Sequence, residues 1–485
     1  MPPRAPRCAL VLCPPWGVTT PPITLGTLAV HLEARGISAS IHDLNLTLYS
    51  TAWEEDRPAW RPDHSDLLEL DYCERFLSRY DAELGTALKQ ILAKDPDVVG
   101  FSINSTNKLV TLRLIERLEL LRPGLPVVVG GFAVRVAEGL GLYLDGGVLV
   151  EGKVDYEYYQ YLLDLVDCFI IGEGEPAFEN VLRLLAAGET LPEGLPGVWT
   201  RETTPETFVP QKLLVDVNAE PWPTYGGFEL DRYNEGRYRV LPVLTARGCV
   251  RRCAFCTDVS FWQRFRSREV ATVLAELEHH YTVLETRSLH FNDLALNGDM
   301  RAFKTLLDGI AAKGYRNLAW AANALVRPSM ADPALAKQLR KACCDLLIFG
   351  LEAGSDRVLR AMRKGFSRAD ALAAFPVLAA EGIKLCINII VGFPGEEEED
   401  FLQTLSLVRD LRPYVTEVHN ANVLQVTPGS ALEKDPLHFG LELPAREHHK
   451  LWSAKDNTPA LRSERLQRLL ELCATLKLPV LCAAG

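Results

Sequence analysis

From residue 240 onward, short apolar runs alternate with longer segments whose apolar residues recur at helical spacing. The short runs predict six strands, at residues 240–245, 288–292, 318–322, 346–351, 385–391 and 418–426. Helices are expected between them, at residues 267–284, 299–313, 332–342, 368–381 and 398–411. Regular alternation of this kind indicates a parallel sheet with crossover helices. Six such units predict an incomplete β/α barrel, whose functional residues lie at the carboxyl ends of the strands.

The first half of the chain alternates in the same way. Strands are expected at residues 9–13, 38–42, 98–103, 127–129 and 168–171, with helices at 25–35 and 108–121. This pattern predicts a doubly wound, Rossmann-like sheet, which binds ligands beyond the carboxyl ends of its strands. The Gly-x-Gly-x-x-Gly fingerprint is absent, which disfavours a nicotinamide or flavin cofactor.

The predicted fold class is therefore α/β, with two principal domains in a chain of 485 residues. The Rossmann-like domain is placed at residues 1–200, with insertions at 49–94 and 138–167. The first insertion is expected to be helical in its second half. A Pro- and Gly-rich linker follows at 201–236, then the barrel at 237–430. A small helical extension at 431–485, with its helix at 463–477, is in position to close the barrel mouth over a substrate.

Composition narrows the class of protein and its compartment. Hydrophobic content of 48% and charged content of 24% are typical of globular proteins. The first apolar run, residues 8–13, is too short to span a membrane or to act as a signal. Twelve cysteines without a disulfide framework indicate the reducing cytoplasm. The net charge of −11 argues against wide contact with nucleic acid.

Three cysteines in one short segment carry the strongest chemical signal: Cys249, Cys253 and Cys256, spaced C-x3-C-x2-C. Three thiolates in one loop can hold three irons of a 4Fe–4S cluster and leave the fourth iron open for a ligand. A structural zinc site is the alternative, but zinc usually takes four ligands from paired cysteine knuckles, and no second pair lies nearby. A disulfide would leave one of the three unpaired.

The later strand ends carry glycines and polar residues. Asn292-Asp293 ends the second predicted strand, residues 350–355 the fourth, and residues 390–396 the fifth. Glycines let a backbone approach a ligand closely, while carboxylates or amides can hold ribose hydroxyls and an ammonium group. Each motif alone is consistent with a strand-terminal turn. Their repetition after the cysteine loop favours a shared site.

The cysteine spacing, with Phe255 just before the last cysteine, resembles the radical S-adenosylmethionine (SAM) superfamily. Residues 350–359 with 362–365, and residues 391–396 with 399–400, resemble signatures of its cobalamin-containing class; the resemblance covers about residues 240–430. It implies that the three cysteines bind a 4Fe–4S cluster whose open iron chelates SAM. The residues it places against SAM are Phe255, Asn292, Asp293, Glu352 and Gly392. The second strand departs from the family by lacking Gly-Gly-Glu.

The first domain resembles the cobalamin-binding domain that precedes many radical SAM cores. The residues implied to contact cobalamin are Pro15, Trp16, Asp43, Ser102, Thr106, Gly130, Gly131, Glu173 and Gly174. The Asp-x-His-x-x-Gly motif, whose histidine ligates cobalt in that family, is missing, and the chain reads Asp43-Leu44-Asn45 instead. A lower ligand from histidine is therefore not expected. A degenerate domain kept for packing is the alternative.

The resemblance implies a cobalamin-dependent radical SAM enzyme that methylates an unactivated carbon. A small-molecule or peptide substrate is expected, with an external one-electron reductant of the flavodoxin or ferredoxin type and no nucleic acid. Radical oxidation or ring formation without methyl transfer is the first alternative. A tRNA methylthiotransferase is less favoured, because the first domain has no second three-cysteine set. A non-enzymatic cobalamin-binding module is the remaining alternative. The substrate and the oligomeric state are not encoded in any recognisable pattern.

Overall fold

The computed structural model divides the chain into two compact units, Met1–Arg239 and Val240–Gly485. It describes residues 4–60, 70–104, 106–131, 161–204, 206–211, 213–214, 216–427, 429–444, 451–455 and 457–484. Most of the second insertion predicted from the sequence, residues 138–160, lies outside the described residues.

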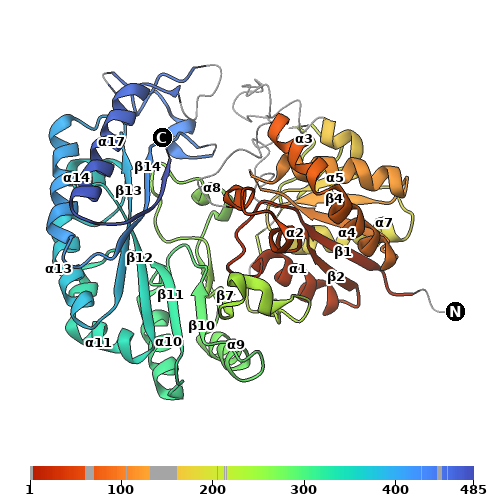
Figure 1. The fold of residues 1–485 in the computed structure, drawn as a ribbon, viewed down its shortest axis with the longest axis horizontal. Helices are drawn as coiled ribbons and strands as arrows, with labels where there is room; N and C mark the ends of the chain where they lie inside the picture. Colours follow the sequence, from red (N-terminus) through yellow and green to blue (C-terminus); the bar gives the residue numbers. More distant parts are fainter. Residues whose placement is uncertain are drawn as a thin grey trace. The chain divides into compact units, whose positions relative to one another are not determined.

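The first unit is built on a mostly parallel sheet (Figure 1). Its strands are β1 (Arg7–Leu12), β2 (Ser38–Asp43), β3 (Val98–Ser102), β4 (Val127–Gly130), β5 (Cys168–Ile170) and β6 (Val198–Trp199). The order is β2-β1-β3-β4-β5-β6, and only β6 runs antiparallel to its neighbour. The five predicted strands are confirmed. The order reverses between β1 and β3, which is where doubly wound sheets bind ligands.

Helices cover both faces of this sheet, because its strands are buried on both sides. One face packs on α1 (Ile23–Glu33) and α7 (Gly174–Ala186). The other packs on α2 (Leu44–Thr51), α3 (Leu70–Arg79), α4 (Asp81–Ala93) and α5 (Lys108–Leu121). Helices α3 and α4 confirm the helical second half of the first insertion. The described residues of this unit also form the 3-10 segments η1 (Arg57–Trp60) and η5 (Leu230–Gly236).

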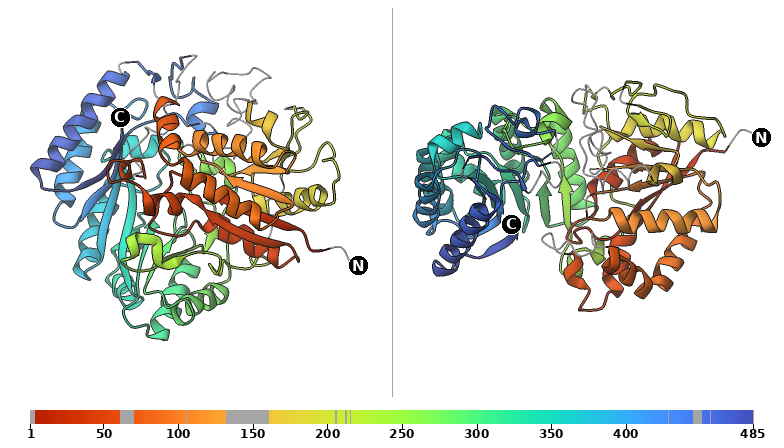
Figure 2. Two further views of the ribbon diagram at one scale, coloured as in Figure 1. Left: turned by 45° about the vertical axis from the view of Figure 1, so that its right-hand side comes forward. Right: turned by 90° about the horizontal axis from the view of Figure 1, so that it is seen from above.

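The second unit is a curled, fully parallel sheet of seven strands (Figure 2). Its strands are β7 (Val240–Val243), β10 (Ser288–Phe291), β11 (Ala319–Ala324), β12 (Cys344–Glu352), β13 (Lys384–Val391), β14 (Glu417–Val423) and β15 (Val480–Ala484). The order is β7-β10-β11-β12-β13-β14-β15. The six predicted strands are confirmed. The C-terminal segment, predicted as helical only, also supplies β15, which pairs in parallel with β14.

On the outer side of the curled sheet lie helices of the second unit, among them α10 (Met300–Lys313), α11 (Pro333–Lys341), α13 (Arg368–Ala380) and α14 (Glu398–Leu411) (Figure 1). Besides these and α8 (Asp258–Trp262) in the segment after β7, the described helical elements of this unit are α9 (Val270–Thr282), η6 (Pro328–Ala331), α12 (Asp356–Ala361), α15 (Ala431–Lys434) and α17 (Pro459–Thr475). Several begin at caps that the sequence provides. Asp299 caps α10, Asp332 caps α11, and Ser367 with Asp370 forms a capping box on α13.

A buried ion pair attaches the C-terminal helix to the sheet. Arg465 of α17 approaches Glu396, in the loop after β13, with 2.9 Å between Nη1 and Oε2. Both side chains are almost fully buried, and Arg465 also donates to the Glu396 carbonyl oxygen. Helix α17 is therefore an integral part of the second unit.

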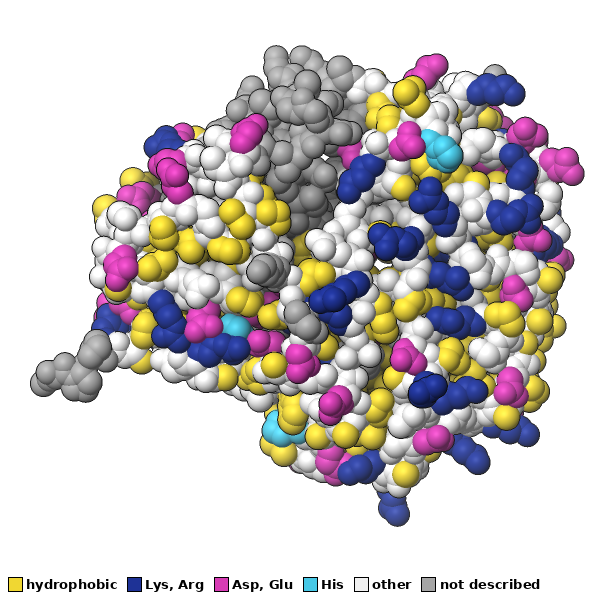
Figure 3. Space-filling model, turned by 180° about the vertical axis from the view of Figure 1, so that it is seen from behind, with side chains coloured by type: hydrophobic (Ala, Val, Ile, Leu, Met, Phe, Trp, Pro, Cys, Tyr) yellow, Lys and Arg dark blue, Asp and Glu magenta, His cyan; other side chains and the backbone are white. Residues whose placement is uncertain are grey.

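The surface shows a mixture of charges. On the face in Figure 3, lysine and arginine side chains of the second unit are interspersed with acidic and apolar ones. Within the described residues, no helix is long and apolar enough to cross a membrane.

Candidate functional site

The cysteine loop leaves the sheet at the carboxyl end of β7. Its base is a two-stranded antiparallel ribbon of β8 (Ala246–Arg247) and β9 (Arg266–Ser267), and the short helix α8 (Asp258–Trp262) lies within it. Gly248 begins the loop with a φ of +84°. A Cβ at this position would lie 2.5 Å from the carbonyl oxygen of Arg264. Only glycine fits this turn, so the residue before Cys249 is fixed by backbone geometry.

Hydrogen bonds to the backbone of Ala254 fix the centre of the cysteine loop. Ala254, which is fully buried, donates its N–H to the Met362 carbonyl oxygen at 3.0 Å. Its own carbonyl oxygen accepts from the N–H of Leu432 at 3.1 Å. The hydroxyl of Thr427 donates to the carbonyl oxygen of Phe255 at 3.0 Å. Segments that follow β12 and β14 therefore fix the residues between Cys253 and Cys256.

The three thiols of the loop are half-buried. The backbone N–H of Arg251 donates to Cys249 Sγ at 3.4 Å, the kind of hydrogen bond that tunes iron–sulfur clusters. Burial raises the pKa of Cys253, and burial with the nearby Asp258 carboxylate raises the pKa of Cys256 to about 12. The thiolate forms of Cys253 and Cys256 are therefore disfavoured unless a bound metal stabilises them.

A zinc ion and an iron–sulfur cluster make different demands on this loop. One zinc ion needs its ligands gathered about a single point, with Zn–S distances of about 2.3 Å. Among the described residues, no group of three or more Cys, His, Asp or Glu side chains is gathered in this way. A 4Fe–4S cluster spreads three thiolates over three irons, and the cysteine loop supplies three cysteines.

Glu352 ends β12 in an unusual backbone conformation. Its φ is +65°, which is costly for a residue with a side chain, and the pairing with β13 shifts register between Gly350 and Glu352. The bulge turns this carboxylate so that Oε1 accepts from Lys364 Nζ at 3.1 Å. Both side chains are buried. Strain of this kind at a strand end is typical of functional sites.

Lys364 follows α12 and lies beside the cysteine loop. Its Nζ is 5.7 Å from the centre of the Phe255 ring. Burial by itself would lower the pKa of Lys364, but the Glu352 carboxylate and the thiols of Cys253 and Cys256 hold that pKa above its ordinary value. The lysine is therefore a buried cation at the cysteine loop.

The two residues predicted at the end of β10 differ in environment. Asn292 is exposed, whereas Asp293 is buried. The Asp293 carboxylate accepts from both the backbone N–H and the hydroxyl of Thr245, the latter at 2.7 Å. Burial raises the pKa of Asp293 to about 6. Asp293 thus fixes the start of the cysteine loop, and Asn292 is the one with a side chain open to a ligand.

Gly392, at the end of β13, is packed against the C-terminal helix. Its φ is +83°, and a Cβ would lie 2.3 Å from the side chain of Arg462. The side-chain amide of Asn457 donates to the Gly392 carbonyl oxygen at 2.9 Å. Glycine is therefore required here by α17, whatever its role toward SAM.

In the first unit, the loops after β1 and β3 meet at the point where the strand order reverses. The hydroxyl of Thr106 donates to the carbonyl oxygen of Pro15 at 3.0 Å. The side-chain amide of Asn107 donates to the carbonyl oxygen of Cys13 at 3.0 Å. Trp16 projects from this edge and is 46% exposed. The structure therefore brings together Pro15, Trp16 and Thr106 where a doubly wound sheet binds its ligand.

The two glycines at the end of β4, Gly130 in the strand and Gly131 directly after it, lie against β3 and the residue that follows it. Gly131 has a φ of +117°, and a Cβ there would lie 2.4 Å from the Ile103 carbonyl oxygen and 3.2 Å from Ser102 Oγ. Gly130 has only ordinary contacts, its nearest neighbour being Ile170 at 3.6 Å. Gly131 is thus required by the backbone, whereas Gly130 is free to serve a ligand.

Two carboxylates predicted to contact cobalamin, those of Asp43 and Glu173, accept hydrogen bonds from other residues of the first unit. Asp43 caps α2 and accepts from the hydroxyl of Tyr233 at 2.5 Å. Glu173 is buried and accepts from the backbone N–H of Leu214 at 2.7 Å. Gly174 begins α7 directly after it. These carboxylates attach the connecting segment to the Rossmann-like sheet.

Asn45 stands two residues after Asp43, in a fully buried position. Its Oδ1 accepts from the backbone N–H of Trp16 at 2.8 Å and from the indole N–H of Trp60 at 2.7 Å. The Asn45 side-chain oxygen already accepts two hydrogen bonds, and its amide nitrogen has no lone pair available for a metal. Asn45 is therefore not suited to bind cobalt. The residues of this edge fit a corrin bound without a protein ligand from this position.

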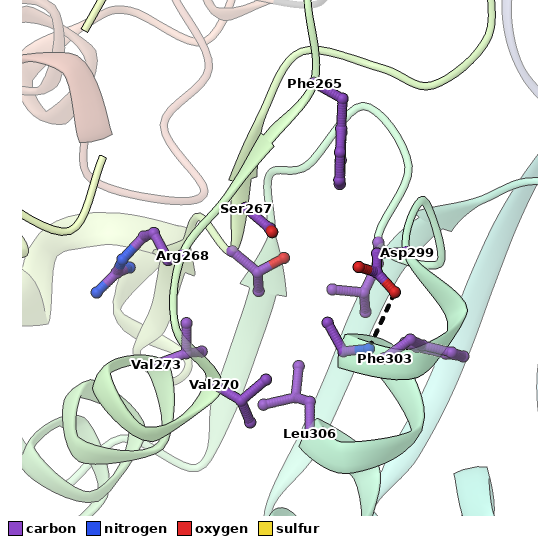
Figure 4. A pocket seen from close by; sticks show the side chains of 11 residues that line it. Phe265, Ser267, Arg268, Val270, Val273, Asp299, Phe303 and Leu306 are labelled. Carbon is purple, nitrogen blue, oxygen red and sulfur yellow. Dashed lines mark hydrogen bonds between the residues drawn. The ribbon is translucent and has the colours of Figure 1, made fainter. Parts of the chain in front are cut away.

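A small pocket lies elsewhere in the second unit, between α9, α10 and β9 (Figure 4). Its lining is mostly apolar, with Thr245, Ser267, Arg268 and Asp299 as its polar members. None of the cysteines or predicted SAM residues lines it. Its place between two helices on the outer side of the sheet is consistent with a packing defect.

Two basic residues of the site were missed as individual candidates. Lys364 belongs to the segment 362–365 that resembles the family signature, and its place between Met362 and Gly365 is the one sequence signal for it. Arg327 follows β11 and donates to the Gly298 carbonyl oxygen at 2.7 Å. Burial lowers the pKa of Arg327, and the nearby cation of Arg251 adds to this effect, while Cys249 opposes it. No local pattern marked Arg327.

Known proteins were compared with the chain by sequence. Residues 243–408 match the model of the Radical SAM superfamily. An uncharacterized methyltransferase of Pyrococcus horikoshii is 25% identical over 51% of this chain and 53% of its own length. A tRNA-2-methylthio-N(6)-dimethylallyladenosine synthase of Sulfurihydrogenibium is 28% identical over 36% of this chain and 42% of its own length. The chain spans about half the length of these curated relatives or less.

Solved structures resemble a larger part of the chain. The radical SAM methyltransferase TsrM of Kitasatospora setae, solved with cobalamin and a 4Fe–4S cluster, has a TM-score of 0.64. The match covers 90% of this chain and 77% of TsrM at 19% identity. The cobalamin-dependent radical SAM enzyme OxsB, with a TM-score of 0.61, is matched over 96% of this chain and 62% of its own at 16% identity. The chain therefore carries a radical SAM domain and has the fold of the cobalamin-dependent radical SAM enzymes.

Proposed function

We propose that this protein is a cobalamin-dependent radical SAM methyltransferase acting on an unactivated carbon. The observation that carries the proposal is the cysteine loop, fixed at Ala254 and placed beside the buried Glu352–Lys364 pair. The chain also has a Rossmann-like sheet whose β1–β3 edge is lined by Pro15, Trp16 and Thr106. The substrate is expected to be a small molecule or a peptide.

When bound, the cluster supplies one electron to SAM, and cobalamin carries a methyl group from SAM toward the substrate. The chain's own residues hold these groups. Cys249, Cys253 and Cys256 would bind three irons, and Phe255 would pack against adenine. Glu352 offers a carboxylate, and Asn292 an exposed amide, to the polar groups of SAM. Gly130 and Ser102 would leave room for the nucleotide tail of cobalamin.

The first test is SAM cleavage by the reconstituted full-length protein. Anaerobic protein loaded with iron, sulfide and cobalamin should form 5′-deoxyadenosine from SAM when a low-potential one-electron reductant is added. Its absorbance spectrum should contain both cluster and corrin bands. Absence of cluster and of SAM cleavage under these conditions would refute the proposal.

Methyl transfer needs its own test, because radical oxidation or ring formation would use the same cofactors. With SAM deuterated in its methyl group, a methylated product gains the label, whereas an oxidised or cyclised product does not. Candidate substrates can be screened by this mass difference. An unlabelled product whose formation depends on both cofactors would favour the alternative chemistry.

A tRNA methylthiotransferase is the second candidate, because curated relatives carry that name. Such an enzyme would need a second set of cluster cysteines in the first unit. The cysteines of that unit are Cys8, Cys13, Cys73 and Cys168, and all four are buried core residues. Burial raises the pKa of Cys13 and of Cys73 to about 12. Cys8 lies in β1 and Cys13 directly after it, whereas Cys73 lies in α3 and Cys168 in β5, and this spread disfavours a second cluster.

A further inference from the structure

We propose that Lys364 is the internal counter-charge of the cluster site, and that its ammonium group raises the reduction potential of the 4Fe–4S cluster. The inference rests on the proposed function, because it presupposes a cluster on Cys249, Cys253 and Cys256. It assigns to Lys364 a positioning and electrostatic role distinct from ligation.

The burial of Lys364 needs an explanation. Its side chain is 8% exposed, and that of Glu352 is 9% exposed. Removing a charged ammonium group from water costs several kcal/mol unless nearby anions compensate it. One Glu352 oxygen at 3.1 Å supplies part of this compensation. A cluster held by three thiolates would supply the rest.

The segment that carries Lys364 contacts the cysteine loop at three places. The Met362 carbonyl oxygen accepts from Ala254 N–H at 3.0 Å. Lys364 Nζ lies 5.7 Å from the Phe255 ring centre. The Gly365 carbonyl oxygen accepts from Arg251 Nη2 at 2.9 Å. Because Ala254 and Phe255 stand between Cys253 and Cys256, the ammonium group lies beside the middle of the ligand loop.

Gly365 makes this close approach possible. Its φ is +66°, and a Cβ would lie 2.0 Å from the guanidinium of Arg251. The positive φ favours glycine at the turn that places Lys364 against the loop, whereas the guanidinium, as the end of a flexible side chain, could move away from a Cβ.

The expected effect on the cluster follows from charge alone. Reduction adds one electron from an external one-electron donor, so the cluster charge falls by one and no bond or proton changes. A fixed positive charge in a poorly solvated site stabilises the reduced state, because neither water nor salt screens it fully. Removing the ammonium should lower the potential, and removing the Glu352 carboxylate should raise it.

The same strand offers a matched control. Lys384 pairs with Asp345 at 3.1 Å, the same distance as the Lys364–Glu352 pair. Asp345 lies near the beginning of β12, and Glu352 ends it. At about 3.3 Å per residue the two carboxylates are roughly 23 Å apart along the strand. The control pair is half-exposed, so solvent screens it.

The test is a redox titration of the anaerobically reconstituted full-length protein, without SAM, followed by the electron paramagnetic resonance of the reduced cluster. Lys364→Met should disfavour reduction about tenfold, a shift of about 59 mV to more negative potential. Lys364→Arg should restore most of the wild-type value. Glu352→Gln should shift the potential in the positive direction. Lys384→Met should leave it unchanged.

Each result decides the proposal. An unchanged potential in Lys364→Met protein with full iron content would overturn it. If that variant loses its cluster, Glu352→Gln still tests the field of the pair, and the absence of a positive shift would overturn it. The protein that carries both Lys364→Met and Glu352→Gln can be compared with the Glu352→Gln protein. If the two have the same reduction potential, Lys364 acts only through Glu352, which would overturn a direct effect of its charge on the cluster. A wild-type protein that binds no cluster would instead refute the proposed function.

Discussion

The two units place similar side chains at the ends of parallel strands but use them differently. In the first, Asp43 and Glu173 are occupied by Tyr233 and Leu214 of the connecting segment. In the second, Glu352 is paired with another charged side chain, Lys364, beside half-buried thiols. A carboxylate at a strand end is therefore not by itself a sign of ligand binding. What distinguishes the two edges is the kind of partner each side chain has.

Cysteines give the sharpest test of this difference, and the largest expected effect. Cys253→Ala should abolish cluster binding and SAM cleavage, because three protein thiolates are the minimum for an open-iron cluster. Cys168→Ala, in buried strand β5, should keep both and lower stability by about 1 kcal/mol. Iron and sulfide content and 5′-deoxyadenosine formation are the measurements. Equal loss in both variants would show that the two kinds of cysteine do not differ in function.

The paired glycines of the first unit separate a backbone role from a ligand role. Gly131→Ala should destabilise the fold by about 3 kcal/mol, because its Cβ would clash with Ile103 and its φ is positive. Gly130→Ala should leave thermal stability unchanged, since its contacts are ordinary. If Gly130 makes room for cobalamin, the alanine variant should bind it at least tenfold more weakly. Unchanged cobalamin affinity would remove Gly130 from the site.

Substitutions of Asn292 and Asp293, the two residues after β10, should affect different properties, SAM binding for the first and stability for the second. Asn292→Ala should weaken SAM binding several-fold without changing the melting temperature. Asp293→Asn should cost about 2 kcal/mol, because Thr245 loses an ionised acceptor in a buried place. Calorimetric SAM titration and thermal unfolding distinguish these outcomes. Weaker SAM binding in Asp293→Asn protein of normal stability would assign the contact to Asp293 instead.

Asp293 also predicts a pH dependence. Burial raises its pKa from 3.8 to about 6, so between these values the folded protein binds more protons than the unfolded chain. The contribution of Asp293 to the free energy of unfolding should therefore fall as pH rises from about 4 to about 6. Asp293→Asn should flatten this part of the stability profile. An unchanged slope in the variant would show that another group titrates there.

The smallest effect is expected at Asp43. Tyr233→Phe removes one donor to this carboxylate and should cost about 1 kcal/mol. Cobalamin affinity should remain as in the wild type if Asp43 serves packing, as its partners indicate. A clear change in cobalamin binding by the phenylalanine variant, measured by absorbance titration, would return Asp43 to the cofactor site.

Local sequence patterns predicted most of the scaffold. Apolar runs predicted eleven strands, five in the first unit and six in the second, because strand burial imposes a visible pattern. Strand β15 was missed, since a five-residue run after a helix, Val480–Ala484, has no distinguishing pattern. The antiparallel β6 was missed for a similar reason, being only two residues long.

Side-chain partners were harder to predict than elements. The cysteine spacing is a local signal, so the sequence alone allows a prediction of the cluster ligands. The hydrogen bonds between Asp293 and Thr245, which lie 48 residues apart in the chain, depend on how β7 and β10 pair. The contact of Lys364 with Phe255 likewise depends on where β12 and its following helix return to the loop. Such contacts are properties of the folded chain.

The two backbone hydrogen bonds of Ala254 have a consequence for how the protein withstands exposure to oxygen. Because these bonds join the loop backbone to segments that follow β12 and β14, we expect the loop to keep its shape without the metal, unlike domains that fold only around a bound ion. Oxidative loss of the inorganic centre should leave the surrounding barrel intact. Iron and sulfide could then be delivered again to the same chain, so damage at this site calls for repair and not for new synthesis.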